Sequence, residues 1–154
     1  MDFKLWLEGH KQYYHGSQKK FPNGFLLLPQ TDGYVLYPET TGLEAFVEKY
    51  RPSNKLARSK SVFLVDNPEL CDLAGGYEDY IYLVRPQGVI EASDLSWYSQ
   101  IETYLDMEEE EKKQCALNYW NGVPFTDRRR RLVEYRTPAA KIIQLFSSEE
   151  SYGI

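Results

Sequence analysis

Short apolar stretches separated by turn-forming residues run along most of this chain, and the pattern predicts strands more often than helices. Each stretch is rich in β-branched or aromatic residues and ends at glycine, proline or a polar cluster. The clearest stretch is DYIYLVRP. We expect strands at residues 11–16, 25–28, 34–37, 61–65, 79–86, 132–136 and 140–146.

Four other segments carry helix signals, namely apolar residues at helical spacing, an N-cap residue or an acidic first turn. Pro68 follows Asp66 and Asn67, and either of these can cap a helix that has proline at its first position. Ser93 or Asp94 can cap another helix. We expect helices at residues 43–50, 68–74, 93–105 and 107–122.

The order of these segments indicates the fold class. The strands are irregularly spaced, and the helices lie between them without a regular strand–helix alternation. This favours an α+β domain built on mainly antiparallel sheets. A chain of 154 residues can bury a substantial core in one domain. We therefore expect a single domain over residues 1–146, with a helical insertion at 93–122 and a polar tail at 147–154.

Charge and cysteine content narrow the function classes. The net charge of −5 argues against capture of nucleic acid by the whole surface, but it leaves room for a local basic patch. Cys71 and Cys115 lie far apart in the sequence with no histidine cluster, so neither a zinc site nor a disulfide framework is expected. No apolar run is long enough to span a membrane, and the first residues lack a secretion signal. We expect a cytoplasmic protein with no membrane partner.

Common catalytic motifs are missing from the sequence. It contains no GxxxxGK[ST], no GxGxxG after a strand, no HExxH and no GxSxG. Its two histidines are His10 and His15, so a Ser-His-Asp or Cys-His site would have to use one of them. His15 has a distinctive context, because it ends an aromatic strand and precedes a glycine.

The segment around His15, YYHGSQKKFPNGFLLLP, resembles the opening segment of ADP-ribosyltransferases, especially the small rifampicin ADP-ribosyltransferase type. That type has an aromatic-rich strand, His-Gly-Ser/Thr, a lysine, a glycine turn and Leu-x-Pro. The matching residues here are His15, Gly16, Ser17, Lys19, Gly24, Leu27 or Leu28, and Pro29.

Three further segments are similar to the family in the expected order. SVFLVDNPELCDLAGG resembles its second motif, and YIYLVRPQGVIEASD resembles the Pro-x-Gly-x-x-acid segment that follows. EYRTPAAKIIQL resembles the last strand pair and the Glu-aromatic-x-x-Pro ending of DNA-directed enzymes of the DarT kind. The resemblance covers most of residues 11–146, although the helical stretch EEEEKKQCALNYWNG has no counterpart in the rifampicin type.

The resemblance implies split antiparallel sheets that form an NAD cleft, and a mono-ADP-ribosyltransferase that cleaves NAD between nicotinamide and ribose. NAD would be the ADP-ribose donor, no metal would be needed, and the acceptor would be a protein or a nucleic acid. We expect a monomer and leave open an inhibitor or antitoxin partner. Whether the chain is a toxin, a phage effector or an antibiotic-modifying enzyme is also left open.

The resemblance assigns the NAD-binding residues. Departure of neutral nicotinamide leaves positive charge on the ribose, so the transition state resembles that of glycoside cleavage. His15 would hold the ribose hydroxyls, and Gly16 would bring its backbone close to the carboxamide. Ser17 and Tyr14 would lie beside them. Phe63 stands where the family usually has a stacking tyrosine. Other aromatic candidates for this role are Tyr34, Tyr37, Tyr77 and Tyr80.

A carboxylate must stabilise the developing charge, and the sequence offers two positions for it. Glu134 lies in an apolar strand, where burying an acid without a partner is costly, and we expect it to be the catalytic residue. The alternative reading is an outward-facing Glu134 paired with an arginine. The second position is the segment after Pro-x-Gly, where strict alignment gives Ser93 and leaves Glu91 or Asp94 as the acid.

The residues just before Glu134 indicate what kind of acceptor the protein would modify. Leu132 stands where arginine-modifying members carry a second acid, which argues against arginine as the acceptor. The run Arg128, Arg129, Arg130 and Arg131 would hold phosphates of a nucleic acid or of NAD, or else would be a solvated charge run. Tyr119 and Trp120 would line the same mouth or anchor the added helix.

Rival functions stay open at this point. A catalytically degenerate protein of the same fold could bind a nucleotide or a protein without turnover, because the second-motif tyrosine is replaced and the Asp is displaced. Plain NAD hydrolysis is a further possibility on the same fold. An unrelated α+β interaction protein with a structural His15 is the remaining alternative.

Overall fold

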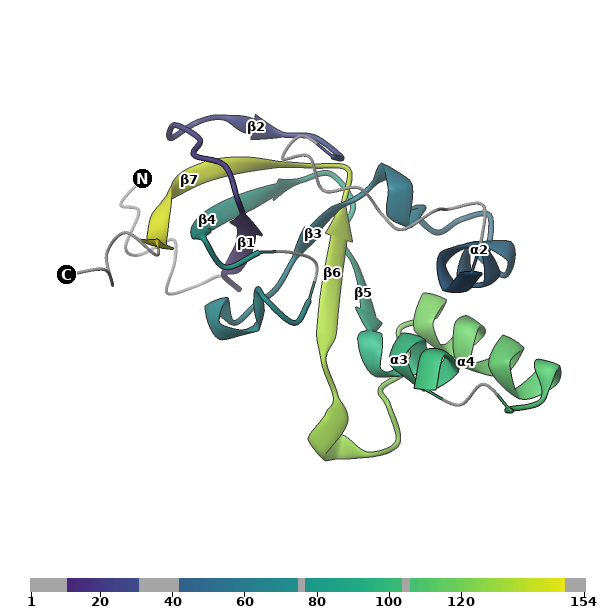
Figure 1. Cartoon of the computed structure of the whole chain (residues 1–154). Coiled ribbons are helices and arrows are strands. Elements are labelled where there is room, and N and C mark those ends of the chain that lie inside the picture. Colours follow the sequence, from purple (N-terminus) through teal and green to yellow (C-terminus); the bar gives the residue numbers. More distant parts are fainter. Residues whose placement is uncertain (1–10, 31–41, 75–76, 104–105, 149–154) are drawn as a thin grey trace.

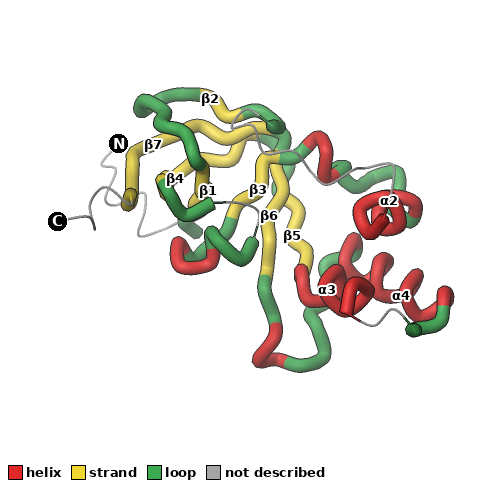
Figure 2. The backbone as a smooth tube through the Cα atoms, in the orientation of Figure 1, coloured by secondary structure: helices red, strands yellow, loops and turns green. Residues whose placement is uncertain are grey.

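The structure is a computed structural model that describes residues 11–30, 42–74, 77–103 and 106–148. Within these residues it is an α+β fold with two antiparallel sheets, as expected from the sequence, and it has three of the four expected α-helices. In Figure 1 the two sheets lie side by side, and the helices are grouped at one end of the molecule. Figure 2 shows that loops connect most of the elements. No helix in this part of the chain is long and apolar enough to cross a membrane.

The larger sheet has four strands in the order β1-β4-β7-β2. Two register shifts in the β4–β7 pairing, at Ile81/Tyr82 and Leu83/Val84, mark irregularities of the kind that bend strands. The sheet curls into a half-barrel, and β7 curves along it in Figure 1. Its strands are β1 (Tyr13–Ser17), β2 (Leu26–Leu27), β4 (Tyr80–Gln87) and β7 (Ala139–Ser148).

The smaller sheet has three strands in the order β3-β6-β5. Its strands are β3 (Val62–Leu64), β5 (Glu91–Asp94) and β6 (Val133–Thr137). It joins the larger sheet through one bridge, in which Tyr14 and Val65 exchange backbone hydrogen bonds of 2.8 and 3.0 Å. The chain also crosses between the sheets at Pro138, which has no N–H to donate to a ladder. Strands β1, β3 and β6 are therefore neighbours.

The helices pack on one another around a second core. They are α2 (Gly42–Lys49), α3 (Leu95–Thr103) and α4 (Glu109–Trp120). Val47 from α2, Trp97 from α3 and Ala116 from α4 are buried in this core. Asp94 caps α3 by accepting a hydrogen bond from Ser96 N at 3.0 Å, which confirms one of the two expected caps. An acidic first turn begins α4, as helix electrostatics favour.

Some expected elements differ from the observed ones. The helix expected at 68–74 is only a 3-10 turn, η2 (Pro68–Leu70), which Asn67 caps by accepting a hydrogen bond from Glu69 N at 3.0 Å. Strand β5 was not expected, since its sequence EASD has no β-branched or aromatic residue. Strand β7 continues to Ser148, so two residues of the expected polar tail pair with β4. The strand expected at 34–37 lies outside the described residues.

Candidate functional site

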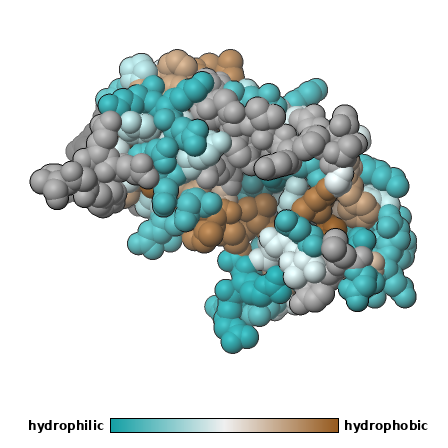
Figure 3. Space-filling view, viewed as in Figure 1, coloured by the Kyte–Doolittle hydropathy of each residue, from teal (hydrophilic) through white to brown (hydrophobic). Residues whose placement is uncertain are grey.

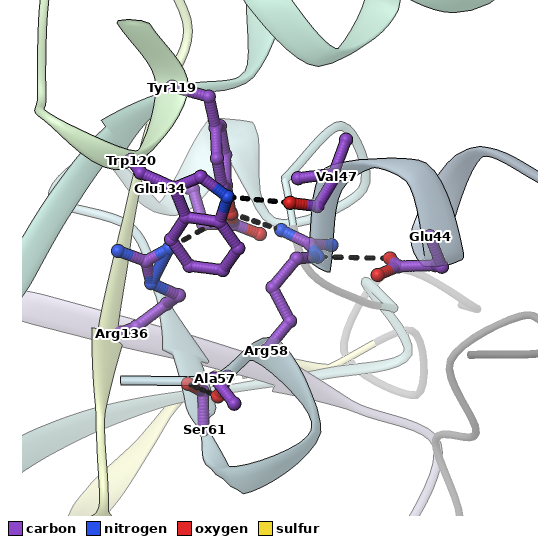
Figure 4. A network of polar contacts seen from close by, with 9 residues as sticks. All are labelled: Glu44, Val47, Ala57, Arg58, Ser61, Tyr119, Trp120, Glu134 and Arg136. Atoms are coloured by element: carbon purple, nitrogen blue, oxygen red, sulfur yellow. Dashed lines mark hydrogen bonds and ion pairs between the residues drawn. The ribbon is translucent and has the colours of Figure 1, made fainter. Parts of the chain in front are cut away.

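Glu134 lies on β6, the central strand of the smaller sheet, and its exposed fraction is 0%. Side chains alternate along a strand, so Glu134 and Arg136 point to one face while Tyr135 points into the sheet core. Only one oxygen of Glu134, Oε2, is bonded within the described residues. It accepts hydrogen bonds from Arg58 Nη1 at 2.7 Å and from the Tyr119 hydroxyl at 2.8 Å. Glu134 is therefore neither bare nor outward-facing, and its partners hold it in one orientation (Figure 4).

Arg58 is the cation at the centre of this cluster. It begins the 3-10 turn η1 (Arg58–Lys60), which precedes β3 and is tied by a hydrogen bond from Ser61 Oγ to the Ala57 carbonyl at 2.7 Å. Arg58 Nε donates to Glu44 Oε1 at 2.9 Å, so one guanidinium serves two buried carboxylates. Burial alone would lower the pKa of Arg58, but Glu134, Tyr119 and Glu44 raise it well above its ordinary value. Arg58 is therefore charged at every physiological pH.

Tyr119, from the end of α4, places its hydroxyl at the meeting point of the cluster. The hydroxyl donates to Glu134 and accepts from Arg58 Nη1 and from Arg136 Nη1, the latter at 3.1 Å. These contacts use the full hydrogen-bonding capacity of a phenol. Burial and the charge of Glu134 raise the pKa of Tyr119 although both arginines oppose this, so the phenol stays neutral.

Trp120, the next residue, anchors α4 to α2. Its indole Nε1 donates to the Val47 carbonyl at 2.8 Å, and its side chain is fully buried. Of the two roles considered for Tyr119 and Trp120, anchoring describes Trp120, whereas Tyr119 belongs to the site. Figure 4 shows both residues beside Arg58 and Glu134.

Several buried polar atoms of this face have no hydrogen-bond partner within the described residues. They are Glu134 Oε1, Ser93 Oγ, and Nε and Nη2 of Arg136. Ser93 lies directly opposite Glu134 in the β5–β6 register. The guanidinium of Arg136 packs on the Trp120 ring, 4.7 Å from its centroid. Buried polar atoms are normally bonded, so this face can still accept a hydrogen bond at Glu134 Oε1, donate from Arg136 Nε and Nη2, and do either at Ser93 Oγ.

His15 and Glu134 are connected through Phe63. His15 is 6% exposed, and its Nδ1 lies 2.8 Å from the backbone oxygen of Phe63. A carbonyl only accepts, so this contact places a proton on Nδ1. The Phe63 ring lies under the Arg58 guanidinium, 4.8 Å from ring centroid to carbon. His15 thus contacts the backbone of Phe63, and the Phe63 ring is linked to Glu134 through Arg58.

The residues flanking His15 have local structural roles. A side chain at Gly16 would meet the Tyr77 carbonyl oxygen only 1.7 Å from its Cβ, so the chain needs glycine there whatever binds nearby. Ser17 Oγ accepts a hydrogen bond from Lys19 N at 3.0 Å and stabilises the turn after β1. Tyr14 lies on the opposite face of β1 from His15 and packs edge-on against Phe146.

Both alternative acids are engaged by backbone amides. Asp94 is 3% exposed and accepts hydrogen bonds of 3.0 Å from the amides of Ser96, Phe125 and Leu132. Glu91 Oε1 accepts from the amide of Leu56, and its Oε2 lies 3.9 Å from Lys55 Nζ. These contacts show that Asp94 and Glu91 stabilise the backbone of neighbouring loops. Within the described residues, Glu134 is the one of the three acids that has a buried carboxylate oxygen without a hydrogen-bond partner.

The remaining candidates make no hydrogen bond or ion pair with Glu134 within the described residues. Arg128, Arg129, Arg130 and Arg131 are all exposed on the loop before β6. Among the other aromatic candidates, Tyr77 and Tyr80 are half-buried. Tyr34 and Tyr37 lie outside the described residues.

Sequence reasoning missed Arg58, Glu44 and Arg136. Arg58 lies in the polar segment RPSNKLARSK, for which no strand or helix is expected, yet it is only 7% exposed. One signal was present, because an acid in an apolar strand requires a buried cation. A second signal was Glu44, which lies three residues before Val47 on the buried side of α2.

No family model, curated protein or solved structure matches this chain.

Proposed function

We propose that this chain is an NAD-dependent mono-ADP-ribosyltransferase whose catalytic acid is Glu134. The observation that carries the proposal is the state of that carboxylate: Arg58 and Tyr119 fix Oε2, while Oε1 has no partner within the described residues. A carboxylate that is oriented in advance and has one available oxygen suits stabilisation of a developing cation. The order of the four motifs and the split antiparallel sheets support the same reading.

The proposed step has balanced chemistry. The bond between the nicotinamide nitrogen and ribose C1′ breaks, and its electron pair leaves with neutral nicotinamide. Positive charge then spreads over C1′ and the ring oxygen, where Glu134 Oε1 stabilises it. A nucleophilic oxygen or nitrogen of the acceptor forms the new bond to C1′ and gives its proton to Glu134 or to solvent. Arg58 and Tyr119 act as positioning residues because they hold Glu134.

Other residues of the same face would bind NAD. His15 would hold the ribose hydroxyls. The unbonded Nε and Nη2 of Arg136 form a planar fork that suits a carbonyl or phosphate oxygen. Because both His15 and Glu134 are buried, the proposal includes an opening step before NAD binds. The apparent affinity for NAD would then be reduced by the fraction of molecules that are open.

Binding and transfer are tested separately. A thermal shift with NAD tests binding, since a ligand at about 100 times its Kd stabilises a protein by about 2.7 kcal/mol. Transfer is tested with labelled NAD and a cell lysate, followed by detection of label on protein and on nucleic acid. We expect Glu134→Gln to keep the thermal shift and lose transfer, and His15→Ala to lose the shift.

Glu91→Gln is the matched control, because it removes a carboxylate from the neighbouring strand and should leave transfer unchanged. Transfer by Glu134→Gln at the wild-type rate would refute the assignment. Release of free ADP-ribose without labelled acceptor would identify NAD hydrolysis as the activity.

One observation favours a second candidate, a nucleotide-binding protein without turnover. Arg58 occupies a face of the Phe63 ring, which is the expected stacking surface for nicotinamide. If Arg58 stays there when NAD binds, nicotinamide cannot stack on that face. A thermal shift with NAD but no release of nicotinamide by the wild type would establish this candidate.

A further inference from the structure

The loop that leads into β6 is strongly basic. We call residues Phe125 to Leu132 the arginine loop. Its four arginines, Arg128 to Arg131, are all exposed, and the first three form the 3-10 turn η3 (Arg128–Arg130). In the orientation of Figures 1 and 3, this loop projects from the lower edge of the molecule and its surface is hydrophilic. The chain as a whole carries a net charge of −5, so this loop is a positively charged patch on a negatively charged protein.

The loop is held in shape by one buried carboxylate. Asp94 Oδ2 accepts a hydrogen bond from the amide of Phe125, and Oδ1 accepts one from the amide of Leu132, each at 3.0 Å. Asp94 therefore ties the two ends of the loop together. Leu95 N also donates to the Leu132 carbonyl at 2.8 Å, and Ser96 Oγ donates to the Arg130 carbonyl. A loop fixed in this way loses little conformational entropy when it binds a partner.

The loop's guanidinium groups have few acidic partners within the described residues. Arg129 lies 3.4 Å from Asp127, and its side chain is 91% exposed. Arg130 contacts the Gln100 amide at 3.4 Å, and Arg131 Nε donates to the Phe125 carbonyl at 2.8 Å. Among the described residues, one carboxylate therefore pairs with the four arginines of the loop, and much of the positive charge is available to a partner.

We propose that the arginine loop binds the phosphate backbone of a nucleic acid. A guanidinium pairs with a phosphate through two parallel hydrogen bonds, and every nucleotide adds one phosphate to the row. Neighbouring arginines on a preorganised loop match such a row better than they match the scattered carboxylates of a protein surface. Only Leu132 and Val133 separate Arg131 from Glu134, so a strand bound here lies close to the candidate site. It follows that nucleic acid is the acceptor, a step that rests on the proposed function.

Fluorescence anisotropy tests the binding without any reaction. The probes are labelled single-stranded DNA, single-stranded RNA and duplex DNA, each of roughly 20 nucleotides per strand. We expect Arg128→Ala/Arg129→Ala to weaken binding at least about tenfold at low salt. It should also reduce the slope of log K against log salt by about 1.4 for single strands, since each phosphate contact contributes about 0.7.

Lys112→Ala/Lys113→Ala is the matched control, because it removes the same charge from α4 and should leave binding unchanged. The conservative variant Arg128→Lys/Arg129→Lys keeps the charge but loses the fork, so intermediate affinity is expected. Unchanged melting temperatures show that the variants fold.

The proposal is overturned if the wild type binds none of the three probes at low salt, if the alanine variant binds as the wild type does, or if poly-glutamate binds as tightly as the nucleic acids. Comparison of the three probes tells which kind of nucleic acid is bound. Binding of nucleic acid without a thermal shift on NAD would keep this inference and refute the proposed function. A thermal shift on NAD without binding of nucleic acid would refute this inference and leave the proposed function standing.

Discussion

The cluster around Glu134 and the arginine loop both depend on arginine, and they lie next to each other along the chain, yet arginine does different work in each. Arg58 and Arg136 are buried, at 7% and 0% exposed, and are bonded to an acid or a phenol. Arg128 to Arg131 are exposed, with one carboxylate among them. Water solvates the second group and not the first, so a buried arginine stabilises the fold only through its partners. An exposed arginine contributes little to stability and is available for binding.

Removal of Arg58 should give the largest effect on stability. Arg58→Ala would leave Glu44 and Glu134 buried without their shared cation, and breaking a buried pair in this way costs about 3–5 kcal/mol. Urea denaturation followed by circular dichroism measures the loss. Arg129→Ala is the control, and it should leave the unfolding midpoint unchanged. Equal unfolding midpoints for Arg58→Ala and the wild type would show that the buried ion pairs of Arg58 do not stabilise the fold.

Asp94→Ala should have the next largest effect, because Asp94 ties both ends of the arginine loop to the start of α3. Three backbone amides would lose their acceptor, and an unsatisfied buried donor costs about 1–3 kcal/mol. The loop would also lose the link between its ends, so nucleic-acid affinity should fall although no arginine has changed. Proteolysis and anisotropy on the same variant measure both effects. Cleavage resistance like that of the wild type would show that other contacts fix the loop.

Tyr119→Phe should have a smaller effect, of about 1–3 kcal/mol, because it deletes the hydroxyl that donates to Glu134 and accepts from two arginines. The ring and its packing remain. The rate of ADP-ribose transfer should fall by a larger factor than the loss of stability alone explains, since Glu134 loses one of its two positioning contacts. Comparison of the urea midpoint with the transfer rate checks this. A fall in stability without any change in transfer would remove Tyr119 from the site.

Alkaline pH should give the most gradual effect. Burial and the charge of Glu44 raise the pKa of Tyr98, and burial raises that of Tyr119, both from an ordinary value of 10.0. The unfolded chain therefore releases these protons first. The stability that depends on the neutral phenols is complete below pH 10.0 and is lost as the pH rises above it. Urea midpoints at pH 8, 10 and 11 should fall, and less steeply in Tyr98→Phe.

The sequence predicted most of the fold but only part of the site. Strands and helices with strong periodicity were placed well, whereas β5 was missed because EASD carries no strand signal. Glu134 stood out as an acid in an apolar strand. Its partner Arg58 did not stand out, because it lies in a polar segment that resembles an exposed loop. Only the tertiary packing shows that this arginine is buried. Gly16 suggested a ligand, but the Tyr77 carbonyl alone requires glycine there, and no pattern in one sequence reveals that contact.

The positions of the last two strands have a consequence for synthesis of the protein. Strand β6 separates β3 from β5, and β7 lies between β4 and β2, so each sheet is completed by a strand from the C-terminal part of the chain. A ribosome makes the chain from the N-terminus, and pairings between distant segments form slowly. Neither sheet, nor the carboxylate of Glu134, can be in place until β6 and β7 have been released. A nascent chain that stalls before them would carry Arg58 and Glu44 without Glu134, so the buried cluster around Arg58 would be incomplete.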